Sequence, residues 1–312
     1  MTLRVSAVCA LALAACLLAA GCGGSDGGNG GDGLSGRITA DGSSTVGPFT
    51  SYAAEAFQKL HSGVQITVGI SGTGGGFERF CAGETDLSNA SRPIKDEETA
   101  ACKEAGIEYV ELQVANDALS VVVNNGNDWA ECLTVEQLKR IWEPGSKLSR
   151  WNQVDPAFPD EKIVLFGPGT DSGTFDFFTA EIVGEEGASR SDYQASENDN
   201  VLVQGVKGQQ GALGYFGFSY YDQNRAGLKA LAVDSGGGCV APGVATAQDG
   251  TYKPLSRPLL VYVKRSALER PEVKAFLDYV VDEAKQIAEA SLFVPLTDSQ
   301  LGEARQRLDE AG

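Results

Sequence analysis

The chain has 312 residues, and 42 Asp and Glu against 25 Lys and Arg give it a formal net charge of −17 at pH 7. A protein this acidic is not expected to bind nucleic acid or an anionic membrane surface, because both would be repelled by its field. The sequence has one histidine, which excludes a metal site built from a histidine cluster. It also contains no G-x-x-x-x-G-K-[ST] motif, which excludes a Walker-type nucleotide site.

The first residues predict export from the cytoplasm. Arg4 precedes an apolar run over residues 5–20, which is shorter than a transmembrane span and ends in small residues, as secretory signals do. The sequence LAAGC resembles a bacterial lipobox, so residues 1–21 are expected to be a lipoprotein signal peptide and Cys22 the lipidated residue. Ordinary cleavage without lipid is the alternative. Residues 22–36 then form a Gly-rich tether, which leaves the protein lipid-anchored on the outer face of the cell membrane or periplasmic.

Three segments rich in glycine and hydroxyl residues each stand before a helical pattern, at 41–48, 71–76 and 167–174. The first backbone N–H groups of a helix lack partners, and the helix dipole favours an anion there. A fourth segment, residues 86–93, adds the guanidinium of Arg92. Each loop alone is more simply explained by ordinary helix capping. Their recurrence favours a site that surrounds a tetrahedral oxyanion.

About 275 residues follow the tether, more than one hydrophobic core usually organises, which predicts two lobes. Strand-like runs alternate with helical patterns, and this order predicts an α/β fold with a mostly parallel sheet in each lobe. The expected strands are 65–70, 107–112, 118–123, 162–166, 228–233 and 258–263. The expected helices are 134–142, 172–183, 271–290 and 298–309. Thr134 and Gln137 form a capping box for the first of these helices.

Four cysteines remain once the signal peptide and Cys22 are set aside, and an exported chain favours disulfides. Their spacing does not fit C-x-x-C metal pairs, so no metal site is expected. Four cysteines allow three connectivities. We favour Cys81 with Cys102 and Cys132 with Cys239.

Five motifs, in this order, resemble those of the phosphate-binding proteins of bacterial high-affinity phosphate ABC transporters, the PstS family. The motifs are 41–45 (DGSST), 71–77 (SGTGGGF), 88–94 (SNASRPI), 167–174 (GPGTDSGT) and 211–216 (GALGYF). The resemblance covers nearly the whole mature length and implies the type II periplasmic-binding-protein fold, with two α/β lobes joined by two crossings of the chain. It places residues 37–117 and 254–312 in lobe 1 and residues 118–253 in lobe 2.

The resemblance also implies the function. The protein would capture inorganic phosphate between the lobes and deliver it to ABC permease subunits, as a monomer without cofactor or enzymatic activity. Its membrane contact would be the lipid anchor only. The phosphate ligands carried over from the family, together with charged and polar residues of the same loops, are Ser44, Thr45, Ser71, Gly72, Thr73, Ser91, Arg92, Asp171, Ser172, Gly173 and Thr174.

Two positions depart from the best-known branch of the family. An aspartate there accepts the phosphate proton just before the position of Arg92, where this chain has Ser91. An arginine there stands four residues before the serine that corresponds to Ser172, and this chain has Pro168 at that position. We therefore expect Arg92 to be the only guanidinium on the anion and Asp171, or else Asp41, to accept the proton. Discrimination between phosphate and sulfate remains open at this stage.

Other functions are compatible with parts of the sequence. A binder of sulfate, molybdate or tungstate would use the same fold and the same loops. A serine hydrolase at Ser172 would need a base, and the one histidine, His61, lies in an expected helix end where an exposed or capping role is favoured. A phosphatase-like metalloenzyme is disfavoured because no cluster of metal ligands is evident.

Overall fold

The structure is a computed structural model and describes residues 33–312, all of which belong to one structural unit. The expected signal peptide, Cys22 and most of the expected tether lie outside the described residues. The last part of that tether is in the sheet, because the first strand begins at Ser35. Within the described part of the chain, no helix combines the length and apolarity needed to cross a membrane.

A nine-stranded mixed sheet has the order β2-β1-β3-β12-β4-β8-β6-β7, with β9 also paired to β4, and β11-β10-β5 form a second, small sheet. Pairing is parallel among β2, β1 and β3 and among β7, β6 and β8, and antiparallel wherever β4 or β12 takes part. The strands are β1 (Ser35–Gly42), β2 (Gly63–Val68), β3 (Leu87–Ala90), β4 (Tyr109–Asn124), β5 (Cys132–Thr134), β6 (Val164–Gly167), β7 (Gln194–Ala195), β8 (Ala212–Gly217), β9 (Leu228–Ala230), β10 (Ala232–Asp234), β11 (Cys239–Val240) and β12 (Ser256–Lys264).

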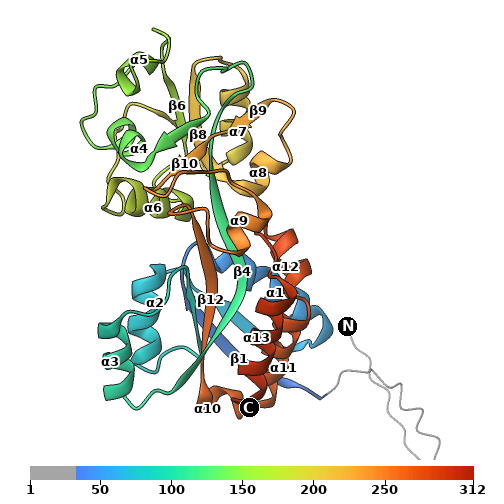
Figure 1. Ribbon diagram of the computed structural model, residues 1–312. Helices are drawn as coiled ribbons and strands as arrows, with labels where there is room; N and C mark the ends of the chain where they lie inside the picture. Colours follow the sequence, from blue (N-terminus) through green and yellow to red (C-terminus); the bar gives the residue numbers. More distant parts are fainter. Residues whose placement is uncertain (1–32) are drawn as a thin grey trace, which may run out of the picture. The chain divides into compact units, whose positions relative to one another are not determined.

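Helices cover both faces of the sheet, and in lobe 1 α2 and α3 lie opposite α1, α11 and α13 (Figure 1). They are α1 (Gly47–Leu60), α2 (Gly72–Cys81), α3 (Asp96–Glu104), α4 (Val135–Trp142), α5 (Trp151–Val154), α6 (Gly173–Phe178), α7 (Asp199–Lys207), α8 (Phe218–Asp222), α9 (Val244–Gln248), α10 (Arg265–Leu268), α11 (Pro271–Asp282), α12 (Ala284–Ala290) and α13 (Asp298–Asp309). A π-helical turn, η1 (Thr179–Val183), continues α6.

The buried apolar residues form two sets of clusters that define the lobes. One set contains residues from 38–115 and 259–308, and the other contains residues from 118–255 together with Val294. The chain passes from one set to the other along β4 and returns along β12, and these two long strands run between the lobes in Figure 1. We call the first set lobe 1 and the second lobe 2. The two strands form the expected hinge of two crossings.

The expected elements are present, but some are divided or joined differently. The helix expected at 271–290 is two helices, α11 and α12, separated by Glu283. The two strands expected at 107–112 and 118–123 are one strand, β4, because the polar residues between them find partners on neighbouring elements. The strand expected at 228–233 divides at Leu231, where the chain leaves β4 for the small sheet. The expected capping box of α4 is confirmed, since Thr134 Oγ1 accepts a hydrogen bond from Gln137 N at 3.1 Å.

Both favoured disulfides are confirmed. Cys81 and Cys102 join α2 to the neighbouring α3, and their sulfurs lie in a small apolar cluster of lobe 1. Cys132 and Cys239 join β5 to β11 within lobe 2. Each bond therefore stabilises one lobe and leaves movement between the lobes unhindered.

Candidate anion-binding site

A pocket of about 730 Å³ lies between the loops of lobe 1 and the start of α6 in lobe 2, beside the two crossing strands. Most of the residues expected from the sequence line it. Those in the lining are Ser44, Thr45, Ser71, Gly72, Thr73, Ser91, Arg92 and Gly173. Asp171, Ser172 and Thr174 are not part of the lining. The structure thus brings together four separate segments of the chain, from both lobes.

The loop before α1 presents two hydroxyl groups to the pocket. Ser43 is buried and holds the loop, because its Oγ accepts hydrogen bonds from Thr45 N at 3.2 Å and Val46 N at 3.4 Å. Ser43 N in turn donates to Asn89 O at 2.9 Å, which fixes the loop to β3. Ser43 therefore orders the loop, while the N-cap residue of α1, Val46, has no side-chain cap. Ser44 Oγ has no partner among residues 33–312, and Thr45 Oγ1, which accepts a hydrogen bond from Arg257 Nη2 at 2.8 Å, can still donate to a ligand.

The start of α2 also lines the pocket and lies beside the end of β1, where Ser71 N donates to Gly42 O at 3.1 Å. Its N-cap residue, Ser71, makes no side-chain hydrogen bond to the helix and instead donates to Asp41 Oδ1 at 2.9 Å. Thr73 Oγ1 lies 3.1 Å from Ser91 Oγ, which ties α2 to the end of β3. The first N–H groups of α2 are thus left without a side-chain cap, and such groups bind anions well.

Arg92 lines the pocket but also has a partner of its own. Its guanidinium donates to both carboxylate oxygens of Glu98, at 2.7 and 2.8 Å. This paired hydrogen bond raises the pKa of Arg92, although burial opposes it. Arg92 is 32% exposed and lies 5.7 Å from the centre of the Phe77 ring. Part of its charge is therefore already neutralised within lobe 1.

A second guanidinium, that of Arg257, lines the same pocket, where only Arg92 was expected. Arg257 is at the start of β12 and its side chain is 11% exposed. Its Nε donates to Asp117 Oδ2 at 3.1 Å and its Nη2 to Thr45 Oγ1 at 2.8 Å. The sequence held one signal for it, a charged residue directly before an apolar strand at a predicted lobe boundary. The pairing with Asp117 depends on strand register, which no local pattern gives.

The loop at residues 167–174, which we call the interlobe loop, contributes mainly Gly173 to the pocket. Ser172 caps α6, because its Oγ accepts a hydrogen bond from Thr174 N at 3.2 Å. A Cβ atom placed on Gly173 would lie 2.5 Å from Thr45 Oγ1 and 2.6 Å from Ser44 Oγ. The lobes are therefore in close contact at this glycine, where a side chain does not fit.

The carboxylates of the site are not those expected. Asp171 is exposed, and its N–H lies 3.4 Å from Glu197 Oε1. Asp41 is buried and already accepts from Gly42 N, from Ser71 Oγ and from Arg79. Neither residue lines the pocket.

Three other acidic residues and four cationic residues line the pocket. The acidic residues are Asp176, Glu181 and Glu186, and the cations are Arg92, Lys95, Lys253 and Arg257. Burial raises the pKa of Asp176, as does Glu186, while Arg257 lowers it. Among residues 33–312, none forms a hydrogen bond or ion pair with the Asp176 carboxylate. This carboxylate is therefore available to a ligand.

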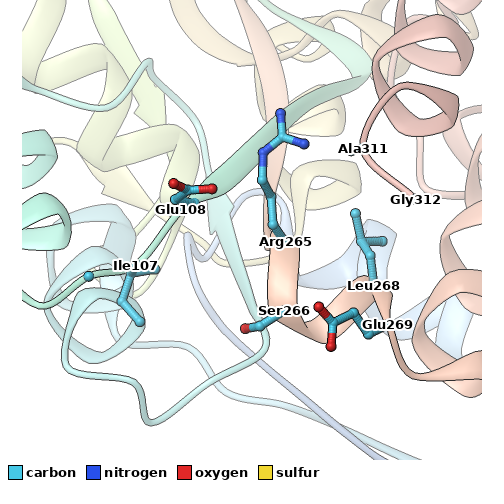
Figure 2. A pocket seen from close by; sticks show the side chains of 9 residues that line it. Ile107, Glu108, Arg265, Ser266, Leu268, Glu269, Ala311 and Gly312 are labelled. Atoms are coloured by element: carbon cyan, nitrogen blue, oxygen red, sulfur yellow. The ribbon is translucent and has the colours of Figure 1, made fainter.

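Another cavity, of about 440 Å³, lies in lobe 1 beside the ends of β4 and β12. Figure 2 shows Glu108, Arg265 and Glu269 among the side chains around it. None of the expected anion loops reaches this cavity. Within the described part of the chain, no group of three or more His, Cys, Asp or Glu side chains could hold a metal ion.

Comparison with known proteins defines first a class and then a family. A family profile described as "PBP superfamily domain" matches residues 27–284. The chain is 47% identical over 273 residues to protein SphX of Synechococcus elongatus, covering 86% of this chain and 80% of that protein. It is 40% identical over 303 residues to the phosphate-binding protein PstS of Staphylococcus saprophyticus, covering 96% of this chain and 92% of that protein.

A solved structure agrees with the sequence comparison. The crystal structure of a possible phosphate binding protein from Planctomyces limnophilus matches with a TM-score of 0.85 and 47% identity, covering 89% of this chain and 99% of that one. The chain belongs to the PBP superfamily and, within it, to the family of the phosphate-binding protein PstS. The expected family and the expected type II periplasmic-binding fold are confirmed.

Proposed function

We propose that this protein captures inorganic phosphate outside the cytoplasm, between its two lobes, and delivers it to the permease subunits of an ABC transporter. The main support is that eight of the eleven expected ligand residues line one pocket, from loops of both lobes. Hydroxyls, helix N-termini and guanidinium groups are the donors that surround a tetrahedral oxyanion. The relatives named phosphate-binding proteins support the same ligand.

Calorimetric titration of the purified protein with phosphate, arsenate and sulfate tests this proposal. We expect one phosphate or arsenate per chain and much weaker binding of sulfate. Sulfate or molybdate binding as tightly as phosphate would instead favour another oxyanion as the ligand. Incubation with a chromogenic phosphate ester tests the proposed absence of enzymatic activity, which is supported by the capping role of Ser172. Steady release of chromophore would contradict it.

We propose the lobe boundaries expected from the sequence, with residues 37–117 and 254–312 in lobe 1 and 118–253 in lobe 2. The separation of the apolar clusters at the two crossings supports these limits. A monomer would suffice for the proposed function, because both walls of the pocket come from one chain.

Arg92 is proposed to contact phosphate together with its partner Glu98. Arg92→Ala should weaken phosphate binding by about 1 to 2 kcal/mol, which is near the contribution of one charge-assisted hydrogen bond. The expected loss is not larger because Glu98 already accepts hydrogen bonds from this guanidinium. Glu98→Gln is the matched variant, since the amide oxygen can still accept from Lys95 N while the charge is removed. It should leave phosphate binding unchanged or tighter. Weaker binding of Glu98→Gln, or unaltered binding of Arg92→Ala, would contradict this role.

Asp176 is proposed as the carboxylate that accepts the phosphate proton, in place of Asp171 or Asp41. Asp176 is half-buried, and a carboxylate enclosed beside the anion can accept a hydrogen bond from hydrogen phosphate but is left unsatisfied by sulfate, which costs about 1 to 3 kcal/mol. Asp176→Asn should therefore narrow the preference for phosphate over sulfate by about 10-fold or more. Asp171→Asn, on the exposed neighbouring loop, is the control and should change nothing.

The pH dependence follows from the same residue. Because the pKa of Asp176 is raised, it takes up a proton at higher pH than an ordinary aspartate. The preference for phosphate should then fall as the pH is lowered through this raised pKa in the wild type. In Asp176→Asn the preference should not change over that range. An identical pH profile in both proteins would exclude Asp176 as the acceptor.

Lipid attachment at Cys22 is proposed from the lipobox-like sequence alone. Cys22→Ala should release the protein from the membrane fraction or block cleavage of the signal peptide, because the acceptor thiol is missing. Fractionation and mass measurement of the N-terminus decide between these outcomes. A variant that stays membrane-bound and normally processed would mean that the anchor is not at Cys22.

A further inference from the structure

Arg257 and Asp117 lie opposite each other on the two strands that join the lobes. They are register partners in the antiparallel pairing of β12 with β4, and their side chains are 11% and 8% exposed. The position is the only place on these strands where the described residues form an ion pair between β4 and β12. A buried pair of this kind must keep its geometry, because leaving either charge without its partner is costly.

The Arg257 side chain contacts both lobes from this position. Its Nη2 donates to Thr45 Oγ1 of lobe 1 at 2.8 Å and lies 3.5 Å from Gly173 O of lobe 2. Its guanidinium carbon lies 3.7 Å from the centre of the Phe177 ring on α6, so the planar group is held against an aromatic ring. One side chain therefore contacts the crossing strand β4, the loop before α1 and helix α6.

The Arg257 guanidinium still has N–H donors that no described residue uses. No acceptor among residues 33–312 takes a hydrogen bond from its Nη1, whereas Arg92 uses both terminal nitrogens on Glu98. Burial penalises the charge of Arg257 and lowers its pKa, and Asp117 only partly opposes this. An anion bound in the pocket would supply the further negative charge and the acceptor atoms that this group lacks.

We propose that Arg257 is the main guanidinium ligand of the bound anion, and that its ion pair with Asp117 couples the anion to closure of the lobes. This inference rests on the proposed function, since it names a ligand for the same site. The main guanidinium ligand would then be Arg257 and not Arg92, whose charge is paired with Glu98 within lobe 1. An anion that bonds to Arg257 is bound at the point where both lobes and both crossing strands meet.

Phosphate titration of three variants tests the inference, with the radius of gyration measured by X-ray scattering before and after saturation. We expect Arg257→Gln to weaken binding about 100-fold or more, as for a buried charge pair that loses one member. Arg257→Lys keeps the charge without the planar fork and should lose about 10- to 100-fold. Asp117→Asn should bind about 10-fold more weakly and show a smaller decrease in radius, because the guanidinium is no longer held to β4.

Arg150→Gln is the control, because Arg150 forms an exposed ion pair with Asp160 in lobe 2, away from the pocket. It should bind and close as the wild type does. The inference is overturned if Arg257→Gln and Arg257→Lys both bind within 10-fold of the wild type, or if saturated Asp117→Asn closes fully. If Arg257→Gln does not fold, the inference is overturned when Arg257→Lys alone binds phosphate within 10-fold of the wild type. A wild type that binds no phosphate would contradict the proposed function itself.

Discussion

Gly173→Val is expected to weaken phosphate binding by at least about 100-fold, or roughly 2.7 kcal/mol. Even the Cβ atom would lie 2.5 Å from Thr45 Oγ1 and 2.6 Å from Ser44 Oγ, so the lobes could close only by displacing the first anion loop. Gly173→Ala should give a smaller loss, since it adds one carbon atom. Overpacking usually costs about 1 to 3 kcal/mol, and here that cost falls on the closed state, because separated lobes relieve it.

Gly302→Val provides the matched control, because a Cβ on this glycine of α13 would meet no atom within 4 Å. Both variants should unfold near the wild-type temperature, with only Gly173→Val losing affinity. Phosphate titration and thermal unfolding measure the two effects separately. If Gly173→Val bound phosphate within five-fold of the wild type, the close approach of the lobes at Gly173 would have no part in binding.

Removing the Cys132 to Cys239 bond is expected to lower the free energy of unfolding by about 4 to 5 kcal/mol. The bond closes a loop with a sequence separation of 107 residues, and chain entropy gives about 4.7 kcal/mol for a loop of about 100 residues. Replacing both cysteines with serine avoids a free thiol. The double variant should keep its phosphate affinity, since neither cysteine lines the pocket.

Urea unfolding of the double variant against the wild type measures this loss. The bond between Cys81 and Cys102 spans 21 residues and should contribute less, about 3 kcal/mol. A double variant that unfolds within 1 kcal/mol of the wild type would show that β5, β10 and β11 hold together without the bond. A parallel loss of phosphate affinity would show that the small sheet supports the pocket.

Motifs close together in the sequence predicted most of the fold and much of the site. The loops at Ser44, Ser71 and Gly173 could be found because each combines small polar residues with a following helix, which is a local pattern. Two disulfides could be expected because four cysteines remained in an exported chain, although that number alone leaves three connectivities. The merging of two expected strands into β4 could not be predicted, because the polar residues between them are satisfied by partners far along the chain.

Most charged residues of the site also could not be predicted from local sequence patterns. Asp171 was expected to accept the phosphate proton, yet it is exposed and does not line the pocket, whereas Asp176 lines the pocket from the first helical turn of α6. Arg257 is separated from Asp117 by 140 residues and from Thr45 by 212. Such contacts depend on strand register and on how the lobes meet, and the sequence alone carries neither.

The most direct test of the proposed site is to locate the anion in a crystal soaked in arsenate, using the anomalous scattering of arsenic. We expect one arsenic atom between the lobes, with its oxygens within hydrogen-bond distance of the Thr45 hydroxyl, the Arg257 guanidinium and the start of α2. Arsenic in the lobe 1 cavity beside Arg265 (Figure 2), and none between the lobes, would contradict the account.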